Sequence, residues 1–180
     1  STLPAFRGAF VSSGSDQEII IPLQKAGARM ASARTGNEFK SSLDARNWLL
    51  SLKLENAVLK NEFGGIGMHE DASPGIDRFD DFTLPPFVQY LDLNHAGETF
   101  FGSPVTRSVV PAKDQNEWRF SVNTNLEEEW VTLSWDHTAF RDDRGVLFLV
   151  DVEKNLRIDM KQEGHYRFRS MPEKDFRIIY

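Results

Sequence analysis

The sequence contains no cysteine among its 180 residues. Disulfide bonds, thiol catalysis and cysteine-ligated zinc are therefore excluded. A cytosolic protein can have this composition, and so can a secreted bacterial β-domain that is large enough to fold without disulfides. Cysteine content therefore leaves the cellular compartment open.

Long basic runs and long apolar runs are also missing. The formal net charge is −6, which argues against nucleic acid and anionic membrane surfaces as partners. No apolar stretch approaches the roughly 18 residues of a membrane-spanning helix, so we expect no membrane insertion. The chain begins Ser-Thr-Leu-Pro, without an initiator methionine or a signal-peptide pattern. We interpret it as a mature protein or an excised domain.

Motifs of the common enzyme classes do not occur either. There is no G-x-S-x-G, P-loop or G-x-G-x-x-G, and no helix signal follows residues 64–67 to make a phosphate cradle. The four histidines show no short metal-ligand spacing; they are His69, His95, His137 and His165. Carboxylates are abundant, but the sequence neither identifies nor excludes the pair that a glycosidase needs. We expect a domain without enzymatic activity.

What the sequence does contain is a series of short alternating segments. Apolar and polar residues alternate over residues 50–55, 118–123 and 130–135, as in strands with one buried face. Further extended segments are expected at residues 5–11, 18–23, 88–93, 100–110, 146–152, 156–160, 166–169 and 176–180. Polar turns separate these segments. The spacing predicts an all-β protein, an antiparallel β-sandwich of immunoglobulin-like or jelly-roll-like type.

A stretch rich in Gly, Pro and Asp, residues 64–87, lies near the middle of the chain and is called the seam loop here. Glycine allows positive φ, proline fixes φ, and Asp side chains bond nearby backbone amides, so an ordered loop is predicted. It separates a β-rich half, residues 1–86, from an immunoglobulin-like half, residues 87–180. Apolar residues recur through the seam loop, so we expect the two halves to form one cooperative unit.

Four carboxylates in the seam loop form the best candidate constellation: Asp71, Asp77, Asp80 and Asp81. Hard cations such as Ca²⁺ take six to eight oxygen ligands, which a Gly-rich loop with several Asp residues can supply. The spacing matches no EF-hand, and Asp residues in such loops also cap turns. We expect turn capping and no cofactor, with structural calcium bound by these four residues as the alternative.

The tryptophans are candidates for contacts with sugars or with other modules. Trp118 and Trp135 alternate in register with apolar residues, which predicts that both lie in the core. Trp130 shares its face with Thr132 and Ser134 and follows the acidic residues 127–129. Its ring is therefore predicted to be exposed, and Trp130 is the candidate ligand-binding residue.

The order of motifs after residue 46 resembles that of a known group of domains. The motifs are a tryptophan strand at residues 48–54, Ala-Ser-Pro-Gly-Ile-Asp-Arg-Phe-Asp-Asp at 72–81, Tyr-Leu-Asp-Leu at 90–93, Trp-Arg-Phe-Ser-Val at 118–122, Val-Thr-Leu-Ser-Trp at 131–135, Leu-Phe-Leu-Val-Asp at 147–151, Ile-Asp-Met at 158–160, Tyr-Arg-Phe at 166–168 and Phe-Arg-Ile at 176–178. Together they resemble the β-sandwich segments near the C-termini of large secreted proteins of the Bacteroidetes type, which commonly precede a type IX secretion sorting domain. The resemblance covers roughly residues 46–180 and implies a secreted, modular, non-catalytic domain, without a defined ligand or catalytic residues.

We therefore expect a non-catalytic accessory or spacer domain of a secreted or cell-surface bacterial protein. Its partners would be neighbouring modules of the same parent chain. The alternative is a carbohydrate-binding module of a secreted polysaccharide-degrading or adhesive protein, which would present exposed aromatic rings in a row or cleft. An enzyme would instead show a deep pocket with convergent titratable groups.

Overall fold

The computed structural model describes residues 46–83, 85–86, 88–100, 102–136 and 145–180. The chain divides into two compact units, residues 1–38 and 39–180, and every described residue belongs to the second unit. The strands predicted at residues 5–11 and 18–23 lie outside the described residues.

The described residues form strands and turns, and none of them is helical. In chain order the strands are β1 (Trp48–Glu55), β2 (Lys60–His69), β3 (Asp81–Phe82), β4 (Leu91–Phe100), β5 (Ser103–Pro111), β6 (Glu117–Thr124), β7 (Trp130–Trp135), β8 (Phe148–Asp151), β9 (Leu156–Asp159), β10 (His165–Arg169) and β11 (Glu173–Ile179). The predicted all-β class is therefore confirmed.

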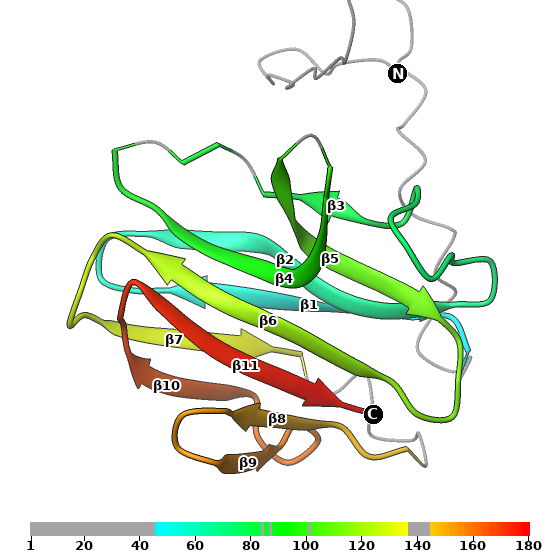
Figure 1. Ribbon diagram of the computed structural model, residues 1–180. Helices are drawn as coiled ribbons and strands as arrows, with labels where there is room; N and C mark the ends of the chain where they lie inside the picture. The colour runs from blue at the N-terminus through cyan, green and yellow to red at the C-terminus, as the bar shows by residue number, and fades with distance from the viewer. Residues whose placement is uncertain (1–45, 84, 87, 101, 137–144) are drawn as a thin grey trace, which may run out of the picture. The chain divides into compact units, whose positions relative to one another are not determined.

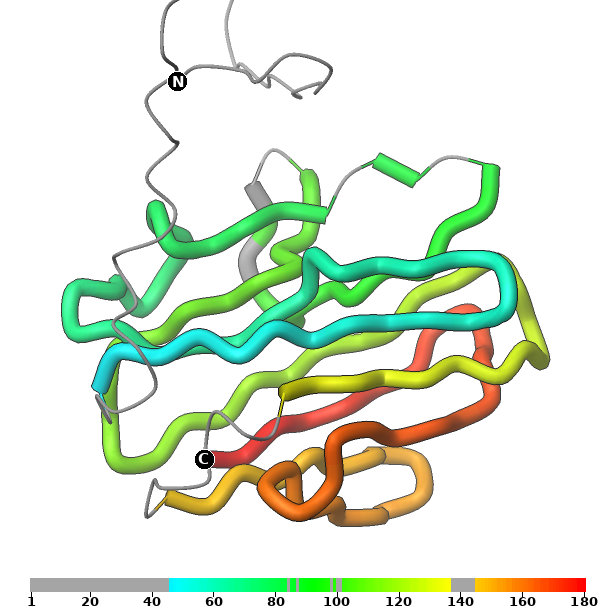
Figure 2. The backbone as a smooth tube through the Cα atoms, turned by 180° about the vertical axis from the view of Figure 1, so that it is seen from behind, coloured from blue at the N-terminus to red at the C-terminus, as the bar shows by residue number. Residues whose placement is uncertain are grey.

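All of these strands belong to one hydrogen-bonded sheet that curls around its own core. The order along the sheet is β10-β7-β1-β2-β5-β4-β6-β11-β8-β9, and β3 pairs with β5 beside this path. Neighbours are antiparallel except for β2 and β5, which are parallel. Figure 1 shows β4, β6 and β11 in front of β1, β2 and β7, and Figure 2 shows the same two layers from behind.

The core lies between these two layers and receives side chains from both. In β1 the residues alternate buried and exposed, with Leu50, Leu52 and Leu54 inside. Phe120 of β6 stacks on Phe176 of β11, with the ring centroids 5.5 Å apart. The alternation that predicted β1, β6 and β7 therefore reflects one buried face on each strand.

The two-sheet arrangement of an immunoglobulin-like sandwich is not confirmed. Two layers do pack over one core, but β5 pairs with both β2 and β4 and so joins the layers into a single sheet. The strands on either side of residue 87 also mix within it, since β1 pairs with β7. The boundary predicted at residues 86/87 therefore runs between strands of the same sheet.

Residues 64–69, predicted as the start of the seam loop, instead form the second half of β2. Neither Gly64 nor Gly67 has a positive φ. A Cβ atom added to Gly67 would lie 2.6 Å from the carbonyl oxygen of Trp48, and one added to Gly64 would lie 2.8 Å from that of Leu52. Both faces of β2 are buried here. The glycines therefore allow neighbouring strands to pack closely and do not form a turn.

Residues 70–83 of the seam loop pack against β2 and β5, and within them β3 pairs with β5. Phe79 is buried and stacks on His69 at the end of β2, with the ring centroids 4.4 Å apart. The Asp80 carboxylate accepts a hydrogen bond from the Val109 N–H of β5 at 2.9 Å. The loop is therefore ordered by packing and hydrogen bonds, as a solvent linker would not be.

Candidate functional site

Trp130 begins β7 and presents its ring on the outer face of the sheet. It is 43 % exposed, whereas Trp118 and Trp135 are buried, so the faces predicted from the alternation are confirmed. The turn before it, residues 127–129, is acidic and exposed. An isolated exposed tryptophan beside charged groups is typical of a surface that contacts a partner.

Two arginines of the neighbouring strand β10 flank this ring. Arg169 lies directly opposite Trp130 in the β7–β10 pairing, and Arg167 lies opposite Thr132. Their guanidinium carbons are 4.4 Å and 4.7 Å from the centre of the Trp130 ring. Arg169 also donates a hydrogen bond to the carbonyl oxygen of Glu128. We call Trp130, Arg167 and Arg169 the tryptophan surface; it offers an apolar ring together with two cations.

The four Asp residues of the seam loop serve different local roles. The Asp77 carboxylate accepts the N–H groups of Ser73 and Phe79 at 2.6 Å and 2.8 Å. Asp80 accepts the N–H of Asp77 at 2.8 Å. Asp81 forms an ion pair with Arg107 of β5.

These contacts favour the turn-capping interpretation of the loop. The backbone N–H of Asp71 donates to His69 Nδ1 at 3.1 Å, and the Asp71 side chain lies on an exposed turn. Burial raises the pKa of Asp80, against the effect of the two backbone hydrogen bonds that it accepts. Within the part of the chain that the structure describes, no group of three or more potential ligands could hold a metal ion. Calcium binding at Asp71, Asp77, Asp80 and Asp81 stays a prediction.

A groove of about 520 Å³ crosses the outer face of β4, β6 and β11. Asn94 and Asn123 are among the residues that line it, and Asn94 donates a hydrogen bond to Asn123 at 3.0 Å. Arg119 of β6 and Arg177 of β11 line it from directly opposite register positions. Arg119 is paired with Glu117 at 2.5 Å, and the carboxylates of Glu173 and Asp175 line the same groove, so charges of both signs meet there.

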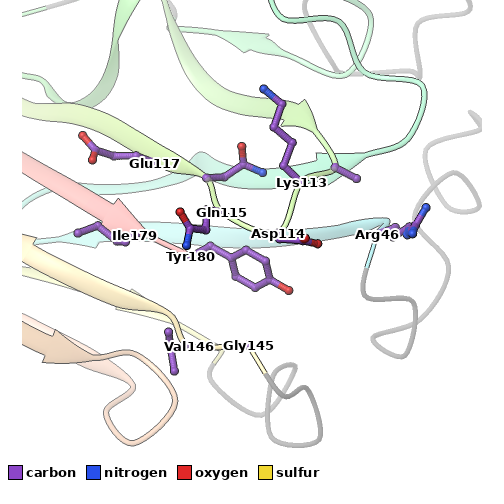
Figure 3. Close-up of a pocket in the computed structure, with 11 residues that line it drawn as sticks. Arg46, Lys113, Asp114, Gln115, Glu117, Gly145, Val146, Ile179 and Tyr180 are labelled. Carbon is purple, nitrogen blue, oxygen red and sulfur yellow. The ribbon is translucent and has the colours of Figure 1, made fainter.

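A larger cleft of about 860 Å³ lies beside the β5–β6 loop and the last residue, Tyr180. Figure 3 shows Lys113 and Arg46 pointing in different directions from the Tyr180 ring, with Asp114 nearby. Charges of both signs line the cleft without converging on one point. Its geometry therefore indicates no particular chemistry.

No protein-family model, curated protein or solved structure matches this chain. None of the described residues belongs to a helix that is long and apolar enough to cross a membrane.

One cluster of chemically active side chains was not predicted from the sequence. Lys174 of β11, Asp151 of β8 and Tyr166 of β10 meet inside the core, where Tyr166 Oη donates to Asp151 Oδ2 at 2.9 Å. Burial, and next the hydrogen bond to Asp151, raise the pKa of Tyr166 to about 12. A signal was present: Lys174 occupies the same alternation face as Phe176 and Ile178, where a charged residue is unusual.

Proposed function

We propose that this chain is a non-catalytic accessory domain of a secreted or cell-surface protein, and that the tryptophan surface contacts a neighbouring module of the same parent chain. The observation that supports this proposal is the exposed Trp130 ring between Arg167 and Arg169 on an otherwise polar outer face. Aromatic and arginine side chains contribute much of the binding energy in protein interfaces.

Replacing Trp130 by alanine tests this proposal. The variant should melt at nearly the wild-type temperature, because the ring is not part of the core. Its affinity for the flanking segments of the parent chain, measured by calorimetry, should fall by about 2 kcal/mol, or roughly 30-fold. Trp135→Ala is the matched control: this ring is buried and donates to the Met160 carbonyl at 2.9 Å, so its loss should destabilise the fold by about 3–5 kcal/mol. Unchanged affinity in Trp130→Ala would contradict the proposal.

A second candidate function, polysaccharide binding, is supported by the groove over β4, β6 and β11. Arg177 Nε is buried and has no hydrogen-bond partner among the described residues. The carboxylate of an acidic sugar would accept a hydrogen bond from Arg177, whereas Arg119 is already paired with Glu117. No exposed aromatic ring supports sugar stacking there, because the lining residues Phe120 and Phe176 are buried. Polar contacts would therefore have to supply the affinity for the sugar.

Affinity electrophoresis with polygalacturonate and with dextran tests the second candidate. The acidic polymer should retard the wild type, and neutral dextran should not. Arg177→Gln should abolish the retardation, whereas Arg169→Gln, which removes the same charge from the tryptophan surface, should preserve it. Equal retardation of both variants would show a nonspecific charge effect and would refute binding in the groove.

A further inference from the structure

The cluster formed by Lys174 and Asp151 has unusual surroundings for an ion pair. The Lys174 side chain is 2 % exposed, that of Asp151 is completely buried, and Nζ lies 3.1 Å from Asp151 Oδ1. A second carboxylate, Glu153, lies 2.7 Å from the same Nζ and is itself open to solvent. Nζ also lies 6.0 Å and 5.6 Å from the ring centres of Phe168 and Phe176. An amine, an acid and a second acid in contact with the amine therefore meet in an apolar, aromatic environment.

We propose that Lys174 and Asp151 condense into an intramolecular isopeptide bond, with Glu153 as the proton carrier. This inference goes beyond the proposed binding role, because it assigns a covalent self-modification that joins β8 to β11. The reaction occurs once per chain and involves no external substrate.

Position favours the reaction. β8 and β11 are neighbouring antiparallel strands, with Asp151 paired to Phe176, and Lys174 lies two residues further along the same face. The sheet thus holds the Lys174 amine and the Asp151 carboxyl within contact distance for as long as the protein is folded. Such fixed pairs reach effective concentrations on the order of 10⁵–10⁸ M, which drive condensations that fail between free molecules in water.

The electrostatics of the cluster sets the charge state of the reactants. Burial acts against charge on both groups, but the hydrogen bonds within the cluster outweigh it, so that the pKa of Asp151 is lowered and that of Lys174 is raised. The reactants therefore begin as ammonium and carboxylate. A proton must pass from the amine to the acid before the amine can attack, and Glu153, in contact with Nζ, is placed to carry it.

The atoms and charges of the step balance. The Lys174 ammonium passes a proton to Glu153, which delivers it to Oδ1 of Asp151, and the lone pair of the neutral amine then attacks Cγ of the carboxylic acid. Tyr166 Oη, which donates to Oδ2, stabilises the negative charge that develops on this retained oxygen. Oδ1 leaves with the electron pair of its bond to carbon. It already carries the proton delivered by Glu153 and takes a second proton from the attacking nitrogen, so that the ammonium and carboxylate have become one amide and one water molecule.

The mass of the intact, denatured full-length chain tests the proposal. We expect a mass lower than that of the sequence by one water molecule. Lys174→Arg keeps the positive charge but cannot form this amide, and Asp151→Ala removes the acid, so both variants should show their full sequence masses. Because the measurement is made on unfolded protein, it does not require either variant to be stable. A wild-type chain with the full sequence mass would overturn the proposal.

Two further measurements assign the site. Tandem mass spectrometry of a protease digest should find Lys174 and Asp151 in one branched peptide. Loss of water at another position, or a loss that persists in Lys174→Arg, would overturn the proposal. Glu153→Gln cannot carry the proton, so freshly made protein of this variant should contain a large uncondensed fraction. Complete condensation at the earliest time in Glu153→Gln would refute the role of Glu153.

Discussion

Lowering the pH from 7 to about 4 should destabilise the fold through one side chain, His95 of β4. Its ring is buried, with Nε2 2.9 Å from the carbonyl oxygen of Gly65 and the ring centre 5.8 Å from that of Phe120. It fills the space where β2 and β4 lie near each other without pairing. Burial lowers the pKa of His95 from 6.5 to about 4, against the opposing effect of the Gly65 hydrogen bond.

The size and sign of the effect follow from this shift. A tenfold change in proton affinity corresponds to about 1.4 kcal/mol, so a pKa of about 4 instead of 6.5 amounts to roughly 3 kcal/mol. The unfolded chain binds the proton more readily than the folded one. The full stability is therefore present above pH 6.5 and is lost progressively as the pH falls to about 4, where the folded state is also protonated.

The pH dependence can be measured by urea unfolding of the wild type and of His95→Gln over this pH range. Tryptophan fluorescence reports the unfolding. Glutamine keeps an N–H donor for the Gly65 carbonyl but does not titrate. The variant should therefore lack only the loss of stability that protonation of His95 causes. The free energy of unfolding of the wild type should fall by about 3 kcal/mol more than that of the variant. Parallel curves for the two proteins would refute the assignment of this pH dependence to His95.

Three other predictions concern strand packing and the seam loop. Gly67→Ala should lower the free energy of unfolding by about 1–2 kcal/mol and Tm by roughly 3–6 °C. Ser51→Ala, at an exposed position of β1, should change the free energy of unfolding by less than about 0.5 kcal/mol. An unchanged Tm in Gly67→Ala would contradict the close packing of β1 and β2. If the seam-loop Asp residues only cap turns, Tm should be equal in millimolar CaCl₂ and in EDTA, and a rise with calcium would establish a calcium site instead. A fragment of residues 88–180 should be less stable than the full chain or should aggregate, because it lacks β1 and β2; melting at the full-length temperature would show independent halves.

Strands with one buried face could be predicted more closely from the sequence than β2, whose second half is buried on both faces. β7 has the bounds predicted from its alternation, residues 130–135, and β1 extends the alternation predicted over residues 50–55 back to Trp48. β2 carries Gly64, Gly65 and Gly67, which resemble turn residues in sequence but lie between packed layers in the structure. The parallel pairing of β2 with β5 could not be predicted, because pairing partners depend on contacts between distant segments.

The same distinction holds for the candidate sites. The exposure of Trp130 could be predicted from its polar neighbours on the same strand. Its arginine partners could not, because Arg167 and Arg169 come from a strand far along the chain. Lys174 could have been noticed as a charge in an apolar register, but Asp151 reaches it only because β8 and β11 pair.

The central position of β1 and β2 in the sheet has a consequence for how the chain folds. These are the first two described strands, yet their outer neighbours are β5 and β7, which come much later. Leu54 pairs with Leu133, for instance, so a long loop must close before that contact forms. Folding dominated by such non-local pairings is slow, on a scale of roughly milliseconds to seconds. During synthesis the β1–β2 hairpin emerges with both edges unpaired, and it must stay free of aggregation until β5 and β7 arrive to enclose it.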